Sequence, residues 1–108
     1  MNDGGRFVRF EDVDVAELGN GLFGKNLVEA QGVELTYITC DEGAGHGFHQ
    51  HDDLEEILIF LEGGCNFNLA GASLDVKGGS MIYIPPKVDH KVSYKEKSKV
   101  LRIKITKP

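Results

Sequence analysis

The sequence predicts an all-β fold, either a small barrel or a sandwich of two sheets. Short segments alternate between apolar and polar residues, as strands with one buried face do. Turns rich in glycine separate these segments, and no stretch carries the periodicity of a long helix. About eight such segments supply enough strands for a closed or two-layered β fold.

The N-terminal part of the chain is the least regular. We expect a strand over residues 6–10 and a short turn or helix over residues 12–18. Glycines predict turns at residues 20–21 and 23–24. Another short strand is expected over residues 25–30.

From residue 33 onward the strand pattern is clearer. Neither face of the strand expected over residues 33–40 is fully polar, which suits a sheet packed on a second sheet and partly covered outside. Residues 43–47 are expected to form a glycine-rich loop. Further strands are predicted over residues 56–61, 65–69, 73–76, 80–84, 88–95 and 100–105, the second and third of them as a hairpin. In the last strand Leu101, Ile103 and Ile105 are expected to point inward.

Length and composition exclude several classes of protein. A chain of 108 residues with 41% hydrophobic content suits one domain with a modest core. The formal net charge of −5 argues against nucleic-acid binding, which needs clustered lysine and arginine. No apolar run is long enough to span a membrane and no signal peptide is recognisable, so we expect a cytoplasmic protein. Cys40 and Cys65 are expected to be buried, reduced thiols.

Basic residues near the C-terminus alternate with other residues along a strand-like segment. A solvated strand face explains this pattern better than an anion-binding site does. These residues are Lys95, Lys97, Lys99, Arg102, Lys104 and Lys107.

Residues 43–56 carry most of the reactive side chains of the chain. They hold three of the four histidines, followed by two adjacent glutamates. Because side chains alternate along a strand, His49 and His51 share one face and can bind one ion together. A hairpin turn at Asp52-Asp53 would bring the following strand back beside these histidines.

A fourth histidine, His90, lies on the apolar face of its predicted strand. A buried histidine or glutamate without a partner is costly, and metal coordination satisfies several of them at once. The residues therefore favour a metal site over histidines satisfied within a core. Glu55 and Glu56 compete for the carboxylate ligand, and alternation does not choose between them because both faces of their strand are apolar.

The spacing of these residues resembles the first sequence motif of the cupin family. That motif is a glycine, five residues, His-x-His, three or four residues, a glutamate, six residues and a glycine. Gly43, His49, His51, Glu56 and Gly63 meet it. Within this resemblance, the six-residue spacing to Gly63 selects Glu56 over Glu55.

The second cupin motif is matched in part. It runs from a glycine through a proline and a second glycine to a histidine and an asparagine. Gly79, Pro85 and His90 meet it, whereas Lys87 replaces the second glycine and Tyr94 replaces the asparagine. The departures affect a turn and the far end of a strand, and the histidine position is filled.

The resemblance implies a cupin fold, which is a double-stranded β-helix or jelly-roll barrel. One domain would span residues 1–108, with an N-terminal segment over 1–32 and the barrel core over 33–105. The resemblance also implies one divalent transition metal, bound by His49, His51, Glu56 and His90. Three imidazoles and a carboxylate suit Fe, Mn, Ni, Zn, Co or Cu, so the ligand set does not choose the metal.

The resemblance implies a small metalloenzyme acting on a small oxygen-bearing substrate. Similar cupins include dioxygenases, sugar isomerases and epimerases, decarboxylases and lyases. The alternative is a module that binds a small ligand, such as a sugar or a carboxylate, without turnover and with a structural metal. Pocket residues are expected on the inward faces of the predicted strands, at Tyr37, Phe60, Phe67, Met81 and Tyr94.

Two further expectations concern His46 and assembly. His46 lies in the predicted loop before the ligands, and either contacts metal or substrate or serves only the loop. Small cupins commonly form dimers, so a homodimer is expected. The irregular N-terminal segment, with Phe7, Val8 and Phe10, would then add a strand to the sheet of the partner.

Overall fold

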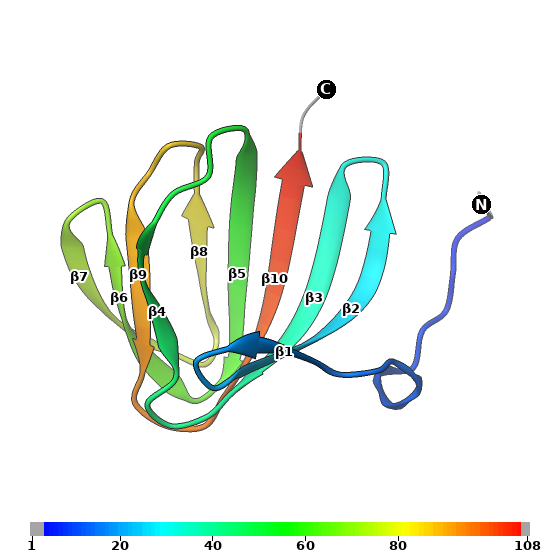
Figure 1. Cartoon of the computed structure of the whole chain (residues 1–108), viewed down its shortest axis with the longest axis horizontal. Helices are drawn as coiled ribbons and strands as arrows, with labels where there is room; N and C mark the ends of the chain where they lie inside the picture. The colour runs from blue at the N-terminus through cyan, green and yellow to red at the C-terminus, as the bar shows by residue number, and fades with distance from the viewer. Residues whose placement is uncertain (1–3, 107–108) are drawn as a thin grey trace.

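The computed structural model describes residues 4–106 and shows an all-β molecule (Figure 1). Within this range the one helical element is a single 3₁₀ turn, η1, over Phe10–Asp12. The strands are β1 (Ala16–Gly19), β2 (Leu22–Ala30), β3 (Val33–Cys40), β4 (Gly45–His49), β5 (Leu54–Glu62), β6 (Gly64–Leu69), β7 (Ala72–Lys77), β8 (Ser80–Ile84), β9 (His90–Tyr94) and β10 (Ser98–Thr106). No helix in the described part of the chain is long and apolar enough to cross a membrane.

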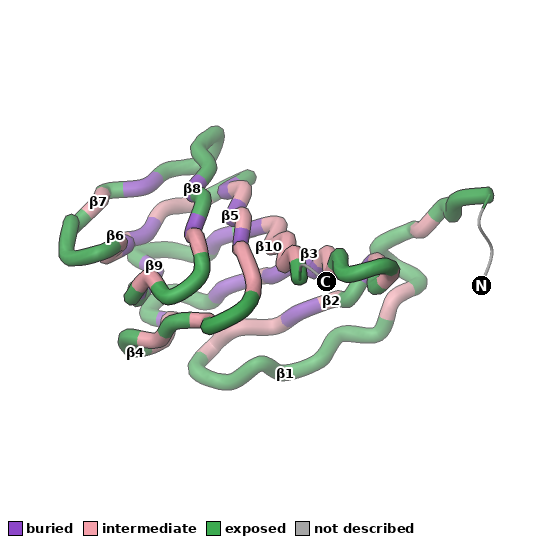
Figure 2. Tube along the Cα trace, turned by 90° about the horizontal axis from the view of Figure 1, so that it is seen from above, coloured by how far each residue is buried: buried purple, intermediate pink, exposed green. Residues whose placement is uncertain are grey.

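The strands form two antiparallel sheets. The larger sheet has the order β1-β2-β3-β10-β5-β8, and the smaller has the order β4-β9-β6-β7. Buried segments occur in the strands of both sheets, whereas most of the loops and of the N-terminal segment is exposed (Figure 2). The prediction of an all-β fold is therefore confirmed, and the core lies between the two sheets.

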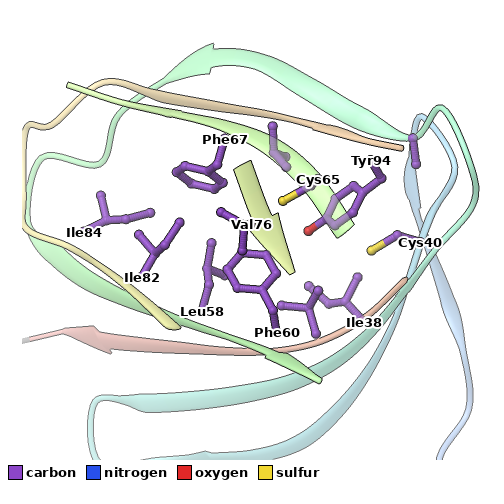
Figure 3. Close-up of a cluster of buried hydrophobic side chains, with 13 residues drawn as sticks. Ile38, Cys40, Leu58, Phe60, Cys65, Phe67, Val76, Ile82, Ile84 and Tyr94 are labelled. Atoms are coloured by element: carbon purple, nitrogen blue, oxygen red, sulfur yellow. The ribbon is translucent and has the colours of Figure 1, made fainter. Parts of the chain in front are cut away.

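Apolar side chains from both sheets fill this core. Phe67 and Cys65 come from β6, Val100 comes from β10, and all three side chains are completely buried. Phe60 of β5 meets Phe67 across the core, with the ring centroids 6.4 Å apart and the planes at 78° (Figure 3). Burial of this apolar area is the main favourable contribution to the free energy of folding.

The prediction that Leu101, Ile103 and Ile105 point inward is wrong. Val100 pairs with Ile38 of β3 and Phe60 of β5, and all three belong to the core. Alternation then places the next residue, Leu101, on the outer face, together with Ile103 and Ile105. Both faces of β10 carry aliphatic residues, so alternation alone does not show which one faces the core.

The N-terminal predictions are also corrected in part. Residues 5–9 form no strand, and the chain reaches its first strand at Ala16. The turn at residues 20–21 is confirmed, with positive φ angles of 53° at Asn20 and 81° at Gly21. The turn expected at residues 23–24 is wrong, because these residues lie inside β2 and pair with β3.

The segment before β5 departs from the expected hairpin. Strand β4 begins at Gly45, inside the predicted loop, and pairs with β9. Strand β5 instead pairs with β10 and β8. Residues 50–53 therefore cross from the smaller sheet to the larger one. The turn residues indicated where the chain reverses direction, but they did not indicate which sheet it joins. By contrast, the hairpin of β6 and β7 is confirmed.

Both cysteines are free and buried, as predicted. Burial raises the pKa of the Cys40 thiol to about 11 and that of Cys65 to about 12. Both thiols are therefore protonated at neutral pH, and a protonated thiol is a poor nucleophile and metal ligand.

Substitution Phe67→Ala should lower the free energy of unfolding by about 3–5 kcal/mol, because it leaves a cavity in a closely packed core. Urea denaturation followed by circular dichroism measures the change. Phe7→Ala is the control, since 85% of that side chain is exposed. Equal losses in the two variants would contradict the placement of the core.

Candidate metal centre

His90 is the residue around which the site is built. It begins β9 and is completely buried. Its Nδ1 lies 3.0 Å from the carbonyl oxygen of Val88, and because a carbonyl only accepts, Nδ1 carries the proton and donates it. The other nitrogen, Nε2, is therefore a lone-pair acceptor. This nitrogen is buried and has no hydrogen-bond partner.

Glu56 brings a carboxylate to the unpartnered nitrogen of His90. It lies on the inner face of β5 and is only 4% exposed. Its Oε1 is 3.7 Å from His90 Nε2, and its Oε2 is 3.5 Å from His51 Nε2. The His51 nitrogen is also buried without a hydrogen-bond partner. A carboxylate and two imidazole nitrogens thus converge at distances that suit a shared cation, and burying them without one would be costly.

His49 and His46 complete the cluster from the smaller sheet. His49 pairs with His90 across β4 and β9, and their ring centroids are 4.2 Å apart. The rings of His46 and His49 are also 4.2 Å apart, and His46 Nδ1 donates to the carbonyl of Gly47 at 2.9 Å. Strict alternation would place residues 46 and 49 on opposite faces. A register irregularity between them, in the pairing of β4 with β9, turns both inward.

Two overlapping groups of potential ligands share His90. One is His46, His49 and His90, the other is His51, Glu56 and His90, and within each group the ligand atoms lie within 4.8 Å of one another. The structure thus brings the four predicted ligands into one cluster, and His46, whose role the sequence left open, joins them. The unpartnered nitrogens and the buried carboxylate fit a divalent transition metal.

The cluster opens into a cavity of about 330 Å³ between the sheets. Apolar side chains of Leu22, Ile38, Leu58, Val92 and Val100 form part of its wall. Two basic side chains, Arg102 and Lys104, also line it. The expectation of a solvated strand face is therefore wrong for these two residues, because β10 places them on the same face as buried Val100. Lys107 lies outside the described residues.

The predicted pocket residues are divided by the structure. Tyr94 lines the cavity. Phe60 and Phe67 belong to the apolar core and do not line this cavity. The inward orientation expected for Met81 and Tyr37 is wrong: Met81 is 56% exposed, and Tyr37 contacts Phe10 outside the barrel.

Tyr94 is held by the core beside the cavity. Its pKa is raised, chiefly by burial and then by Cys40 and Cys65. Its hydroxyl hydrogen-bonds the Cys40 side chain, and Figure 3 shows the Tyr94 side chain between Cys40 and Cys65. The phenol is therefore neutral and partnered at ordinary pH.

The environment of the histidines favours the neutral ring that a metal requires. Burial lowers the pKa of His49 to about 4, with further lowering by the nearby His46 and His90. Burial also lowers the pKa of His46 and His51, and in His51 Glu56 opposes this effect.

These shifts predict how the stability of the metal-free protein depends on pH. His49 has a pKa of about 4 in the folded state and about 6.5 when unfolded, so the unfolded chain binds this proton first. The free energy of unfolding should therefore fall as pH drops from about 6.5 to about 4. Thermal melting in the presence of a chelator measures this dependence. The variant His49→Gln should lose less stability over the same interval, and a parallel loss would contradict the assignment.

Comparisons with known proteins agree with this architecture. The family model described as "Cupin domain" matches residues 36–103. A curated protein of Methanocaldococcus jannaschii, "Uncharacterized protein MJ1618", is 46% identical over 44 residues, which are 41% of this chain and 35% of that protein. The match thus spans about a third of that relative's length.

Solved structures share the fold at low sequence identity. An RmlC-like cupin from Shewanella frigidimarina has a TM-score of 0.89 at 21% identity, covering 95% of this chain and 92% of that one. KdgF from Halomonas sp. has a TM-score of 0.90 at 20% identity, covering 96% of both chains. A predicted oxalate decarboxylase from Thermotoga maritima has a TM-score of 0.87 at 16% identity, covering 94% and 100%. With the match over residues 36–103, the chain belongs to the cupin family.

Proposed function

We propose that this cupin is a small metalloenzyme that binds one divalent transition metal and acts on a small oxygen-bearing substrate, by dioxygenase, isomerase or lyase chemistry. The observation that carries the proposal is the convergence of two buried, unpartnered imidazole nitrogens on the Glu56 carboxylate. A cavity of about 330 Å³ beside them is large enough for a small substrate.

The proposed ligands are His49, His51, Glu56 and His90. Together these four side chains would hold the metal, which would supply Lewis-acid chemistry toward a substrate oxygen. The chain itself orients the ligands. Val88 fixes the His90 tautomer through its carbonyl, and Glu56 is held on a strand paired on both sides.

The cavity wall supports the proposal in a second way. Its apolar side chains exclude water from much of the site, which strengthens electrostatic interactions with a bound substrate. One solved structure with this fold is named as a predicted oxalate decarboxylase, which is consistent with small-molecule chemistry in such a barrel.

A binding module without turnover is the second candidate. The observation that favours it is the state of Tyr94, the phenol that lines the cavity. Its hydroxyl is engaged by Cys40 and its pKa is raised, so it is a poor proton donor or acceptor for a substrate. In this reading the metal would hold a small ligand in place.

Metal content tests the ligand set. Protein purified without an affinity metal should carry about one equivalent of a single transition metal. His51→Ala should lower this content to below about one tenth of an equivalent, because loss of a ligand weakens binding strongly. Asp53→Asn is the control, since this exposed carboxylate neighbours the site in sequence but belongs to neither ligand group. Full occupancy of His51→Ala would rule out this ligand set.

Turnover screening separates the enzyme from the binding module. The metal-loaded protein would be incubated with small sugars, hydroxy acids and keto acids, under air and under nitrogen. Consumption only under air indicates a dioxygenase, and consumption under both indicates an isomerase or a lyase. Binding of a compound without its consumption, in calorimetry and product analysis, would favour the module.

We also propose a homodimer. The outer face of the larger sheet is rich in aliphatic side chains. Met81 and Leu61 lie on this face and are exposed. The N-terminal segment adds Phe7, which is 85% exposed. Exposed apolar patches of this kind commonly mark interfaces between protein chains.

Light scattering coupled to size exclusion tests the assembly. The wild-type protein should show twice the mass of one chain at micromolar concentration. Met81→Asp should shift the mass toward one chain, because a charge would be buried in the interface. Phe48→Asp is the matched control, since this side chain is similarly exposed, 57% against 56%, but lies on the smaller sheet. A monomeric wild-type protein would refute the dimer.

A further inference from the structure

Strand β10 places two positive charges inside the barrel, next to the metal cluster. Arg102 pairs with Leu58 of β5 and Lys104 pairs with Glu56, the proposed carboxylate ligand. On the other side, the same two residues pair with Thr36 and Glu34 of β3. Both basic side chains line the cavity that the histidines line.

Arg102 has donors that the protein leaves unused. Its side chain is only 22% exposed, and its Nε is buried without a hydrogen-bond partner. Its Nη2 lies 3.6 Å from Oε1 of Glu34, which is beyond hydrogen-bond distance. A guanidinium presents five N–H donors in a planar fork that fits a carboxylate. A buried donor of this kind is costly unless a ligand meets it.

Lys104 carries a second positive charge without a close partner. Within residues 4–106, its ammonium group takes part in no ion pair or hydrogen bond. Its side chain nevertheless lies beside the histidine cluster, since it lines the same cavity as His49 and His51 and its strand position pairs with Glu56. It is therefore close enough to interact with a ligand bound beside the metal.

The charges of the cavity indicate the charge of its ligand. Arg102 and Lys104 are balanced by Glu34 and Glu56, and an imidazole that binds a metal does so as the neutral ring. A divalent metal then adds two positive charges that no residue of this set offsets. Because burying net charge is unfavourable, a ligand that carries two negative charges fits this cavity best.

We propose that Arg102 and Lys104 form an anion subsite that binds one carboxylate of a small dicarboxylate, whose other carboxylate lies at the metal. This inference rests on the proposed function for the metal end of the ligand. The apolar wall of Leu22, Ile38, Leu58 and Val92 suits a short carbon chain between the two ends. A cavity of about 330 Å³ limits the ligand to a small molecule.

Calorimetric titration with malonate and succinate tests the subsite. Each dicarboxylate would be titrated into the zinc-loaded and the metal-free protein, with malonamide as the uncharged analogue of malonate. The variants are Arg102→Gln and Lys104→Gln. Lys99→Gln is the matched control, because it removes a positive charge from the same strand on the opposite face. Metal content and thermal melting are measured for every variant, and Arg102→Lys replaces Arg102→Gln if the latter fails to fold.

At least one dicarboxylate should bind the zinc-loaded wild-type protein, and malonamide should not. Arg102→Gln and Lys104→Gln should each weaken this binding at least about tenfold with unchanged zinc content, whereas Lys99→Gln should change it less than about twofold. No dicarboxylate binding, equal binding by malonamide, or binding within about twofold of wild type in both variants would overturn the subsite.

Failure of the metal site would be recognised separately. If the wild-type protein retains neither zinc nor any other divalent transition metal after reconstitution, the proposed function fails, and titration of the metal-free protein then decides the subsite. The anion subsite is upheld if the metal-free protein binds a dicarboxylate and both Arg102→Gln and Lys104→Gln weaken this binding. It is refuted if neither substitution changes the binding.

Discussion

The burial of Glu56 against the unpartnered nitrogens of His51 and His90 is the constraint on which the site depends. Glu56 comes from the larger sheet and His90 from the smaller, so the two sheets meet at this point. Without a cation between them, the carboxylate and the nitrogens are poorly compensated. Metal binding would therefore stabilise the contact between the sheets as well as supply the chemistry.

The core supports this contact directly. The ring of Phe67 stacks parallel to that of His90, with the centroids 6.1 Å apart and the planes at 2°. Both side chains are completely buried, so the imidazole has little room to rotate. Its tautomer is fixed from the other side by the carbonyl of Val88. Packing and hydrogen bonding together orient the lone pair toward Glu56, which is the kind of rigidity that a metal ligand requires.

The barrel interior has an unequal distribution of polar groups. One part of the core is wholly apolar and includes Val100, whereas the cavity contains the histidines and two basic residues. Strand β10 links these parts, because Val100, Arg102 and Lys104 follow one another along its inner face. Its outer face is aliphatic, which reverses the usual arrangement of a strand at a protein surface. Charged side chains on an inner strand face are tolerated only where water in a cavity or a bound ligand compensates their charge.

The sequence by itself determined the all-β class, the β6–β7 hairpin and the candidate ligands, because alternation and short motifs are local. The spacing of His49 and His51 follows from their neighbours alone, and similarity to a family motif singled out Glu56. Only the tertiary structure decided which face of β10 is inside and that residues 50–53 cross between sheets. The irregularity in β4 that turns His46 inward also appeared only there. Alternation specifies which residues share a face, whereas the pairing of distant strands determines which face is buried.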